Sequence, residues 1–165
     1  MPVHDVLVFA YGNPSRGDDA LGPSALDHLA DCAHPGIELL GDFQLQVEHA
    51  LDLEQRRLVL FIDADASCSA PFRFIRLQPA RDRSYTTHAM SPAAVLQVFE
   101  DLRGEPPPCF LLGIRGYRFE LGEPLSEAAR ANLEAAARFL DALCVRPDPT
   151  HWQSLSQLKS PAVPA

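Results

Sequence analysis

Two short runs of consecutive apolar residues constrain the fold of this chain more than any other feature. They are residues 6–10 (VLVFA) and 58–62 (LVLFI), and both are rich in β-branched and aromatic residues. A strand with one face in water alternates apolar and polar residues, whereas a strand buried on both faces does not. The two runs therefore predict central strands of a mostly parallel sheet that helices cover on both faces.

Strand and helix patterns alternate along the rest of the chain. Further strands are expected at 37–40, 72–77 and 110–114, and helices at 22–33, at about 46–54, after Ser91 and after Ser126. The stretch between 58–62 and 72–77 is too short for the crossover that parallel neighbours need, so these two strands should be antiparallel. The predicted fold class is α/β: a single three-layer domain with a mostly parallel twisted sheet of about five strands, one of them antiparallel.

The composition changes near the end of the chain. After Val145 the sequence becomes polar and rich in proline, and it ends SPAVPA. Segments of this kind seldom bury enough surface to be held in place. We therefore expect one α/β domain over residues 1–146 and a flexible tail over 147–165.

Charge and cysteine content exclude several classes of function. The formal net charge of −8 opposes binding to nucleic acid or to an anionic membrane surface. No apolar run approaches the roughly 18 residues of a membrane span, and the start does not read as a signal peptide. The four cysteines form no CxxC pair, as expected for free thiols in a reducing compartment. We expect a cytoplasmic protein without a nucleic-acid or membrane partner.

The segment after the first strand, residues 12–19 (GNPSRGDD), has an unusual charge pattern. The spacing of Gly12 and Gly17 is that of a phosphate-binding P-loop, but such a loop continues with Lys and then Ser or Thr. Asp18 and Asp19 stand there instead and would repel phosphate. No GxGxxG occurs either, so neither a nucleotide nor a dinucleotide site is supported. The loop should face a cation or a hydrogen-bond donor.

Two more polar residues are expected at the same edge of the sheet. Asp63 directly follows the second apolar run, where burying a carboxylate costs free energy unless the carboxylate has a function. Asp65 faces the same way if the strand continues. His88 lies in the segment that leads into the helix after Ser91. Ligands of open α/β sheets bind at the carboxyl ends of the strands, so we expect Asp19, Asp63 and His88 to converge there.

Each of these residues also has an ordinary interpretation on its own. Asp19 could stabilise a helix start, Asp63 could end a strand, and His88 could be an exposed histidine. Together, two carboxylates and one imidazole suit a divalent ion such as Ni, Zn, Co or Mn, and they suit proton transfer equally well. Cys68 lies near Asp63 but has no histidine placed as its base, and the other five histidines show no comparable placement.

Several segments, in the right order and spacing, resemble the hydrogenase maturation endopeptidases between about Val6 and Val145. The segments are Gly12-Asn13 with Asp18-Asp19-Ala20-Leu21-Gly22, then LFIDA at 60–64, THAMS at 87–91, FLLGI at 110–114 and GEPLS at 122–126. The resemblance departs from the common pattern at Ala10, where many members have glycine, and at 42–46 (DFQLQ), where many have a Gly-Thr turn. The second departure resembles the branch that serves cytoplasmic bidirectional or NAD-linked hydrogenases.

The resemblance implies a definite activity. Such enzymes remove a short C-terminal extension from the large subunit of a nickel–iron hydrogenase after nickel has been inserted. It assigns nickel contact to Asp19, Asp63 and His88, with the nickel carried by the substrate, and it makes the large-subunit precursor the partner. A nickel-sensing chaperone that does not cleave, and an unrelated metal-dependent hydrolase on a similar sheet, are the alternatives.

Overall fold

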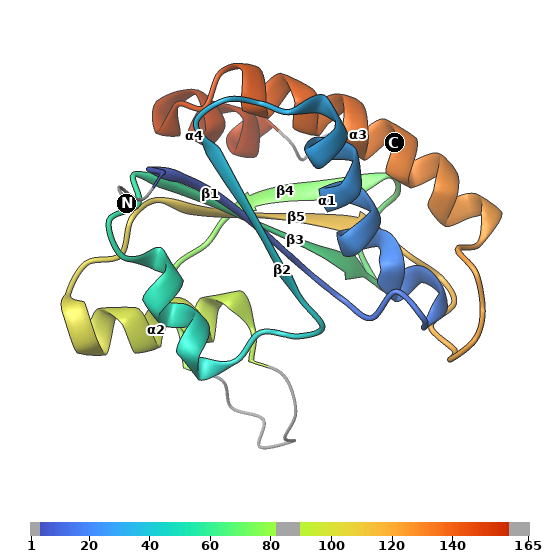
Figure 1. Cartoon of the computed structure of the whole chain (residues 1–165), viewed down its shortest axis with the longest axis horizontal. Coiled ribbons are helices and arrows are strands. Elements are labelled where there is room, and N and C mark those ends of the chain that lie inside the picture. Colours follow the sequence, from blue (N-terminus) through green and yellow to red (C-terminus); the bar gives the residue numbers. More distant parts are fainter. Residues whose placement is uncertain (1–3, 82–89, 159–165) are drawn as a thin grey trace.

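The computed structural model describes residues 4–81 and 90–158, and their centre is a five-stranded sheet (Figure 1). The strands are β1 (Val6–Tyr11), β2 (Ile37–Asp42), β3 (Leu58–Asp65), β4 (Phe72–Arg76) and β5 (Cys109–Arg115). Their order across the sheet is β2-β1-β3-β5-β4. All neighbours are parallel except β4 and β5. The predicted fold class is therefore confirmed.

Helices cover both faces of the sheet. They are α1 (Leu21–Cys32), α2 (Pro92–Arg103), α3 (Glu127–Val145) and α4 (Pro149–Leu158), with 3-10 helices η1 (Gly17–Ala20) and η2 (Val47–Leu53). Helices α1, α3 and α4 lie on one face, and α2 and η2 lie on the other (Figure 1). The serine caps expected at Ser91 and Ser126 are present, since each side chain accepts a hydrogen bond from the third residue of its helix.

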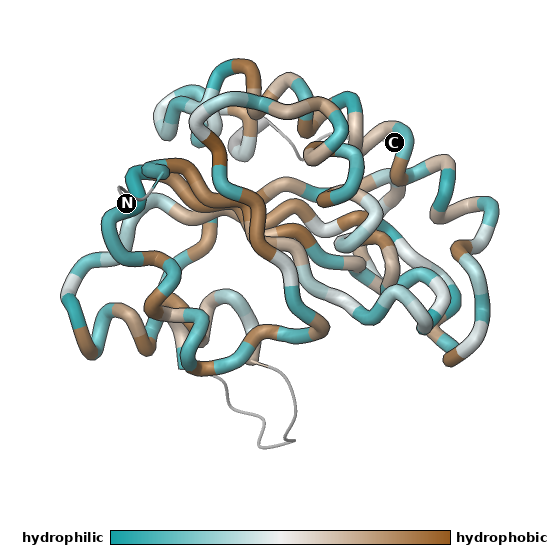
Figure 2. The backbone as a smooth tube through the Cα atoms, viewed as in Figure 1, coloured by the Kyte–Doolittle hydropathy of each residue, from teal (hydrophilic) through white to brown (hydrophobic). Residues whose placement is uncertain are grey.

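The uninterrupted apolar runs are explained by two separate cores. Val6, Val8 and Ala10 of β1 pack toward α1 and α3, whereas Leu7 and Phe9 pack toward η2 and α2. Successive residues of a strand point to opposite faces, so a strand between two helical layers must be apolar at every position. Figure 2 shows these strands as the hydrophobic centre of the molecule.

One expected neighbour relation needs correction. β3 and β4 run in opposite directions as predicted, but they are not paired, because β5 lies between them and β4 pairs with β5 instead. The segment between β3 and β4 only has to cross over one intervening strand. A short connection therefore predicted the direction of β4 but not its neighbour.

The expected flexible tail is wrong for residues 149–158, which form α4. Trp152 is fully buried, and its ring lies 5.6 Å from that of Phe110 and 6.2 Å from that of Phe74. Its Nε1 donates to the carbonyls of Leu143 and Arg146. A single large aromatic side chain anchors this polar helix, which the proline-rich composition concealed. Residues 159–165 lie outside the described residues.

None of the helices in the described part of the chain combines the length and the apolar character needed to cross a membrane.

Candidate functional site

Two glycines let the loop after β1 fold tightly against the carboxyl end of the sheet. Gly12 has a φ of +148°, and a Cβ there would lie 2.2 Å from the carbonyl oxygen of Asp19. A Cβ at Gly22, in the first turn of α1, would lie 2.5 Å from the carbonyl oxygen of Tyr11. Neither position has room for a side chain, so the close approach of the loop and of α1 to β1 requires glycine. This packing places Asp18 and Asp19 at the sheet edge.

Asp18 has a structural role. It is fully buried, and its carboxylate accepts hydrogen bonds from the backbone of Tyr117 and Arg118 and from both the backbone and the hydroxyl of Ser126, at 2.7–3.0 Å. Burial alone raises the pKa of Asp18, but these hydrogen bonds outweigh it and hold the pKa below its usual value. The carboxylate thus ties the loop after β1 to the start of α3, and its complete burial keeps it from a ligand.

Asp19 is the available carboxylate of the pair. Its Oδ2 accepts a hydrogen bond of 2.7 Å from the backbone N–H of Asn13, which fixes the orientation of the side chain. Within residues 4–81 and 90–158, no group donates to its Oδ1. The side chain is half-buried, so one oxygen is held by the loop and the other can meet a ligand.

Asp63 lies beside Asp19 and Tyr11. Strand β3 continues to Asp65, so Asp63 is part of the strand rather than the residue after it. Its Oδ1 accepts a hydrogen bond of 2.8 Å from the backbone of Ala64, and Tyr11 donates a side-chain hydrogen bond to it. Burial, opposed by these hydrogen bonds and reinforced by the charges of Asp19 and Asp65, raises the pKa of Asp63 to about 7. The ionised form of Asp63 is therefore disfavoured here, and a cation beside it would stabilise that form strongly.

Asp65 is committed to the turn after β3. Its Oδ1 accepts backbone hydrogen bonds from Ser67 and Cys68, and its Oδ2 forms an ion pair of 2.7 Å with Arg73. Although burial raises the pKa of Asp65, these contacts lower it overall. Of the two aspartates in β3, only Asp63 is available for a ligand.

His88, the third expected member, lies outside the described residues and remains a prediction. His49 of η2 lies near the end of β2, but both of its ring nitrogens are occupied. Its Nδ1 accepts a hydrogen bond from the backbone of Gln46, and its Nε2 donates to Asp42 at 3.1 Å. His49 therefore cannot take the place of His88 without losing one of these contacts.

No cysteine in the described part of the chain is placed to act as a nucleophile at this edge. Burial, reinforced by the charge of Asp65, raises the pKa of Cys68 to about 11, so its thiol stays protonated at neutral pH. Among the described residues at this edge of the sheet, the carboxylates are therefore the candidate reactive groups.

Sequence reasoning missed Tyr11. Its side chain is buried, and burial together with the neighbouring charge of Asp63 raises its pKa well above the usual value, so the phenol stays a hydrogen-bond donor. Ala10 pairs with Ile62, which places the next residues of the two strands, Tyr11 and Asp63, side by side. A tyrosine as the last residue of an otherwise apolar strand is the signal that could have identified it.

The raised pKa of Asp63 predicts a pH-dependent stability. On folding it rises from 3.8 to about 7, so the folded chain holds an extra proton between these values and its free energy of unfolding falls as pH rises through them. We expect Asp63→Asn to remove this decline and to be more stable than wild type by about 2–4 kcal/mol at about pH 8. Urea unfolding of both proteins at about pH 4 and about pH 8 measures the difference. A stability gap that does not change with pH would contradict the prediction.

The fold was compared with known proteins. Neither the protein-family models nor the curated protein sequences give a match. Among solved structures, the maturation protease HycI from Thermococcus kodakarensis aligns with a TM-score of 0.67 and 21% identity, covering 87% of this chain and 94% of that one. The maturating endopeptidase HybD from E. coli aligns with a TM-score of 0.64 and 25% identity, covering 84% and 91%.

A hydrogenase 2 maturation peptidase from a Thaumarchaeota archaeon aligns with a TM-score of 0.60 and 25% identity, covering 84% of this chain and 97% of that one. The two neighbours at 25% identity are named as an endopeptidase and a peptidase, and they support the prediction that this chain is a peptidase. In its fold, and over most of its length, the chain is a structural relative of the hydrogenase maturation endopeptidases.

Proposed function

We propose that this protein is an endopeptidase that removes a C-terminal extension from the nickel-loaded large subunit of a nickel–iron hydrogenase. The observation that carries the proposal is the pair Asp19 and Asp63. Asp19 comes from η1, after β1, and Asp63 comes from the last part of β3. They lie close enough for their charges to interact, and they belong to a fold shared with solved maturation proteases. The substrate is the precursor with its nickel, and the cytoplasm is the proposed site of action.

The carboxylate pair is suited to recognise a cation that arrives with the substrate. Without a cation, the charge of Asp19 disfavours ionisation of Asp63. A divalent ion reverses this preference, displaces the proton and accepts an oxygen ligand from each aspartate. With the imidazole of His88 as the proposed third ligand, the set has the oxygen and nitrogen donors that borderline divalent metals accept. Docking of the precursor is thereby coupled to the presence of nickel.

Asp63 is also suited to the cleavage step. Nickel binding would keep Asp63 ionised, and an ionised carboxylate can act as a general base through the oxygen that does not contact the metal. We propose that Asp63 takes a proton from water that attacks the scissile amide and passes it to the leaving amine as the C–N bond breaks, while Tyr11 holds its carboxylate in position. Polarisation of the amide carbonyl by the substrate's nickel is the second route.

Nickel dependence tests the proposal directly. We expect precursor carrying nickel to be cleaved at least about 100-fold faster than nickel-free precursor, because a difference of about 3 kcal/mol in docking suffices. The mass of each precursor is followed by mass spectrometry at equal concentration after its metal content has been measured. The control is the enzyme variant Asp101→Asn, which loses a carboxylate from the exposed side of α2 and should process the nickel-loaded precursor normally.

Three outcomes decide between the candidate functions. Loss of a C-terminal fragment from the nickel-loaded precursor supports the peptidase. Binding without any change of mass would indicate a chaperone, and turnover of small amides or esters alone would indicate an unrelated hydrolase. Equal cleavage rates on the nickel-loaded and nickel-free precursors would mean that Asp19 and Asp63 do not recognise nickel.

A further inference from the structure

A second group of metal-binding side chains lies at the opposite end of α1 from Asp19. His28 and Cys32 are four residues apart on this helix, so they share one of its faces, and Asp141 of α3 meets them there. Helix α1 has 12 residues and is therefore about 18 Å long. Asp19 precedes its first turn, whereas Cys32 ends it shortly before the chain enters β2. The two groups are thus separate.

The donor atoms of these three residues converge. His28 Nε2 lies 3.0 Å from each carboxylate oxygen of Asp141, and Cys32 Sγ lies 3.7 Å from His28 Nε2. One donor atom from each residue lies within 4.8 Å of the other two. In a tetrahedral zinc site with bonds of about 2.0–2.3 Å, ligand atoms are about 3.3–3.8 Å apart. Small side-chain adjustments therefore bring all three atoms to bonding distance of one ion.

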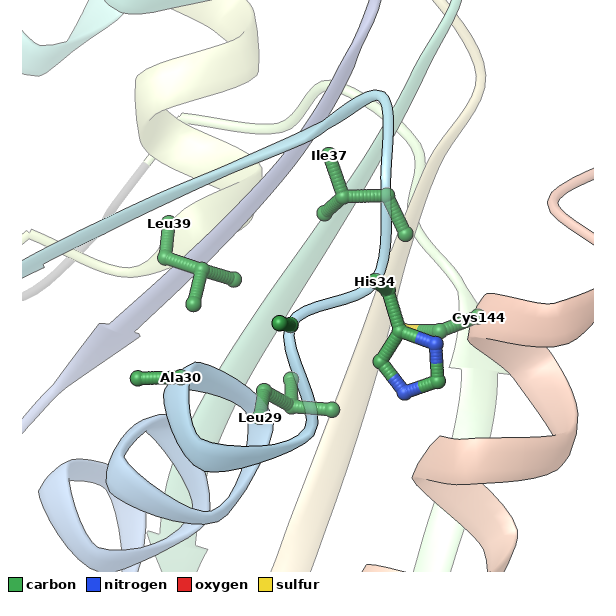
Figure 3. Close-up of a pocket in the computed structure, with 7 residues that line it drawn as sticks. Leu29, Ala30, His34, Ile37, Leu39 and Cys144 are labelled. Carbon is green, nitrogen blue, oxygen red and sulfur yellow. The ribbon is translucent and has the colours of Figure 1, made fainter.

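A second histidine supports the carboxylate. His34, in the connection between α1 and β2, contacts Asp141 Oδ1 through its Nε2 at 3.3 Å, and its side chain is 15% exposed. Figure 3 shows His34 beside Cys144 of α3, at the rim of a mainly apolar pocket of about 110 Å³. Hydrogen-bonding neighbours of this kind orient metal-binding carboxylates and strengthen such sites.

A catalytic cysteine–histidine–aspartate group does not explain the arrangement. Such a group needs both ring nitrogens of its histidine, one toward the carboxylate and one toward the nucleophile. Here Nε2 of His28 faces both Asp141 and Cys32. Convergence on a single point is what a metal ion requires.

We propose that His28, Cys32 and Asp141 bind one Zn²⁺ ion, with a fourth position open to solvent. One nitrogen, one sulfur and one oxygen ligand suit zinc, and the thiolate disfavours Mg²⁺, Ca²⁺ and Mn²⁺. The bound ion links the last turn of α1 to α3 and replaces the ion pair between His28 and Asp141. This site does not depend on the function proposed for Asp19 and Asp63.

The test measures metal binding by the full-length, metal-free chain. Co²⁺ is titrated first, because a cobalt–thiolate bond gives a charge-transfer absorption that reports on Cys32, and Zn²⁺ is then used to displace it. Both titrations use the D19N/D63N variant, so that the carboxylate pair at the other end of α1 is removed. We expect one equivalent of Co²⁺ to bind with the thiolate absorption, and Zn²⁺ to displace it.

Single substitutions in the same background identify the ligands. We expect Cys32→Ser to abolish the thiolate absorption, and His28→Gln and Asp141→Asn each to weaken Zn²⁺ binding at least tenfold. Cys68→Ser and His151→Gln are matched controls and should bind as the parent does. Cys32 is exposed, so Cys32→Ser should fold normally, which circular dichroism checks. An unchanged cobalt spectrum in Cys32→Ser, or no displaceable metal in the parent, would overturn the proposal.

Discussion

Asp19→Asn is expected to lower processing of the nickel-loaded precursor by roughly 100-fold or more while leaving the protein folded. Asparagine can still accept the hydrogen bond from the backbone of Asn13 through its amide oxygen, so the loop after β1 keeps its conformation. It has lost the negative charge that a cation would meet. Processing rates are followed by mass spectrometry, and urea unfolding should give a stability within about 0.5 kcal/mol of wild type.

Asp18→Asn, one residue earlier, is the matched control and should have the opposite effect. The fully buried carboxylate of Asp18 accepts four hydrogen bonds, and an amide would direct its NH₂ group at some of those donors. We expect a loss of about 2–4 kcal/mol in the free energy of unfolding. Processing per folded molecule should stay near wild type.

The adjacent pair separates a chemical role from a structural one. Asp19→Glu, which keeps the carboxylate, should retain measurable processing. If Asp18→Asn abolished processing in fully folded protein, or if Asp19→Asn processed normally, the roles assigned to the two residues would have to be exchanged.

Trp152→Ala is expected to destabilise the protein by about 3–5 kcal/mol, because it removes a large, fully buried side chain of α4. The rings of Phe74 and Phe110 would lose their contact with it, and the carbonyls of Leu143 and Arg146 would lose their donor. Urea unfolding measures the change. Ser154→Ala, on the exposed side of the same helix, is the control and should alter stability by less than about 0.5 kcal/mol.

Truncation after Arg146 also tests the packing of α4 on the sheet, but it removes the whole helix and so leaves no cavity beneath it. Removing α4 exposes the surface of β4 and β5 that Trp152 covers, so the shortened chain should be destabilised at least as much as Trp152→Ala. A truncated protein as stable as the full chain would show that α4 contributes nothing to the core.

The strands were predictable from the sequence because their signal is local. Residues 6–10 and 58–62 are apolar at every position, which is typical of strands between two helical layers, and β1 and β3 contain them. The helix caps at Ser91 and Ser126 are equally local. The helix α4 was missed because the aromatic neighbours that bury Trp152 come from β4 and β5, far away in the sequence.

The candidate site was predictable only in part, for the same reason. Asp19 and Asp63 were located by their positions after the apolar runs at 6–10 and 58–62. The distinct role of Asp18 was not visible, because its hydrogen-bond donors come from residues 117–126, about 100 positions later. The group formed by His28, Cys32 and Asp141 was hidden similarly, since Asp141 belongs to a helix that approaches α1 only in the folded chain.

The contacts of Asp18 have a consequence for the order in which this protein assembles. Its carboxylate is satisfied only by the segment that runs from β5 into α3, so the loop that carries Asp18 and Asp19 is tied to the rest of the fold only after Ser126 has been synthesised and packed. During translation, an emerging chain that already contains Asp19 and Asp63 does not yet contain the residues that donate hydrogen bonds to Asp18 in the loop between β1 and α1. A prematurely terminated chain that lacks Ser126 would therefore lack the tie between this loop and the start of α3.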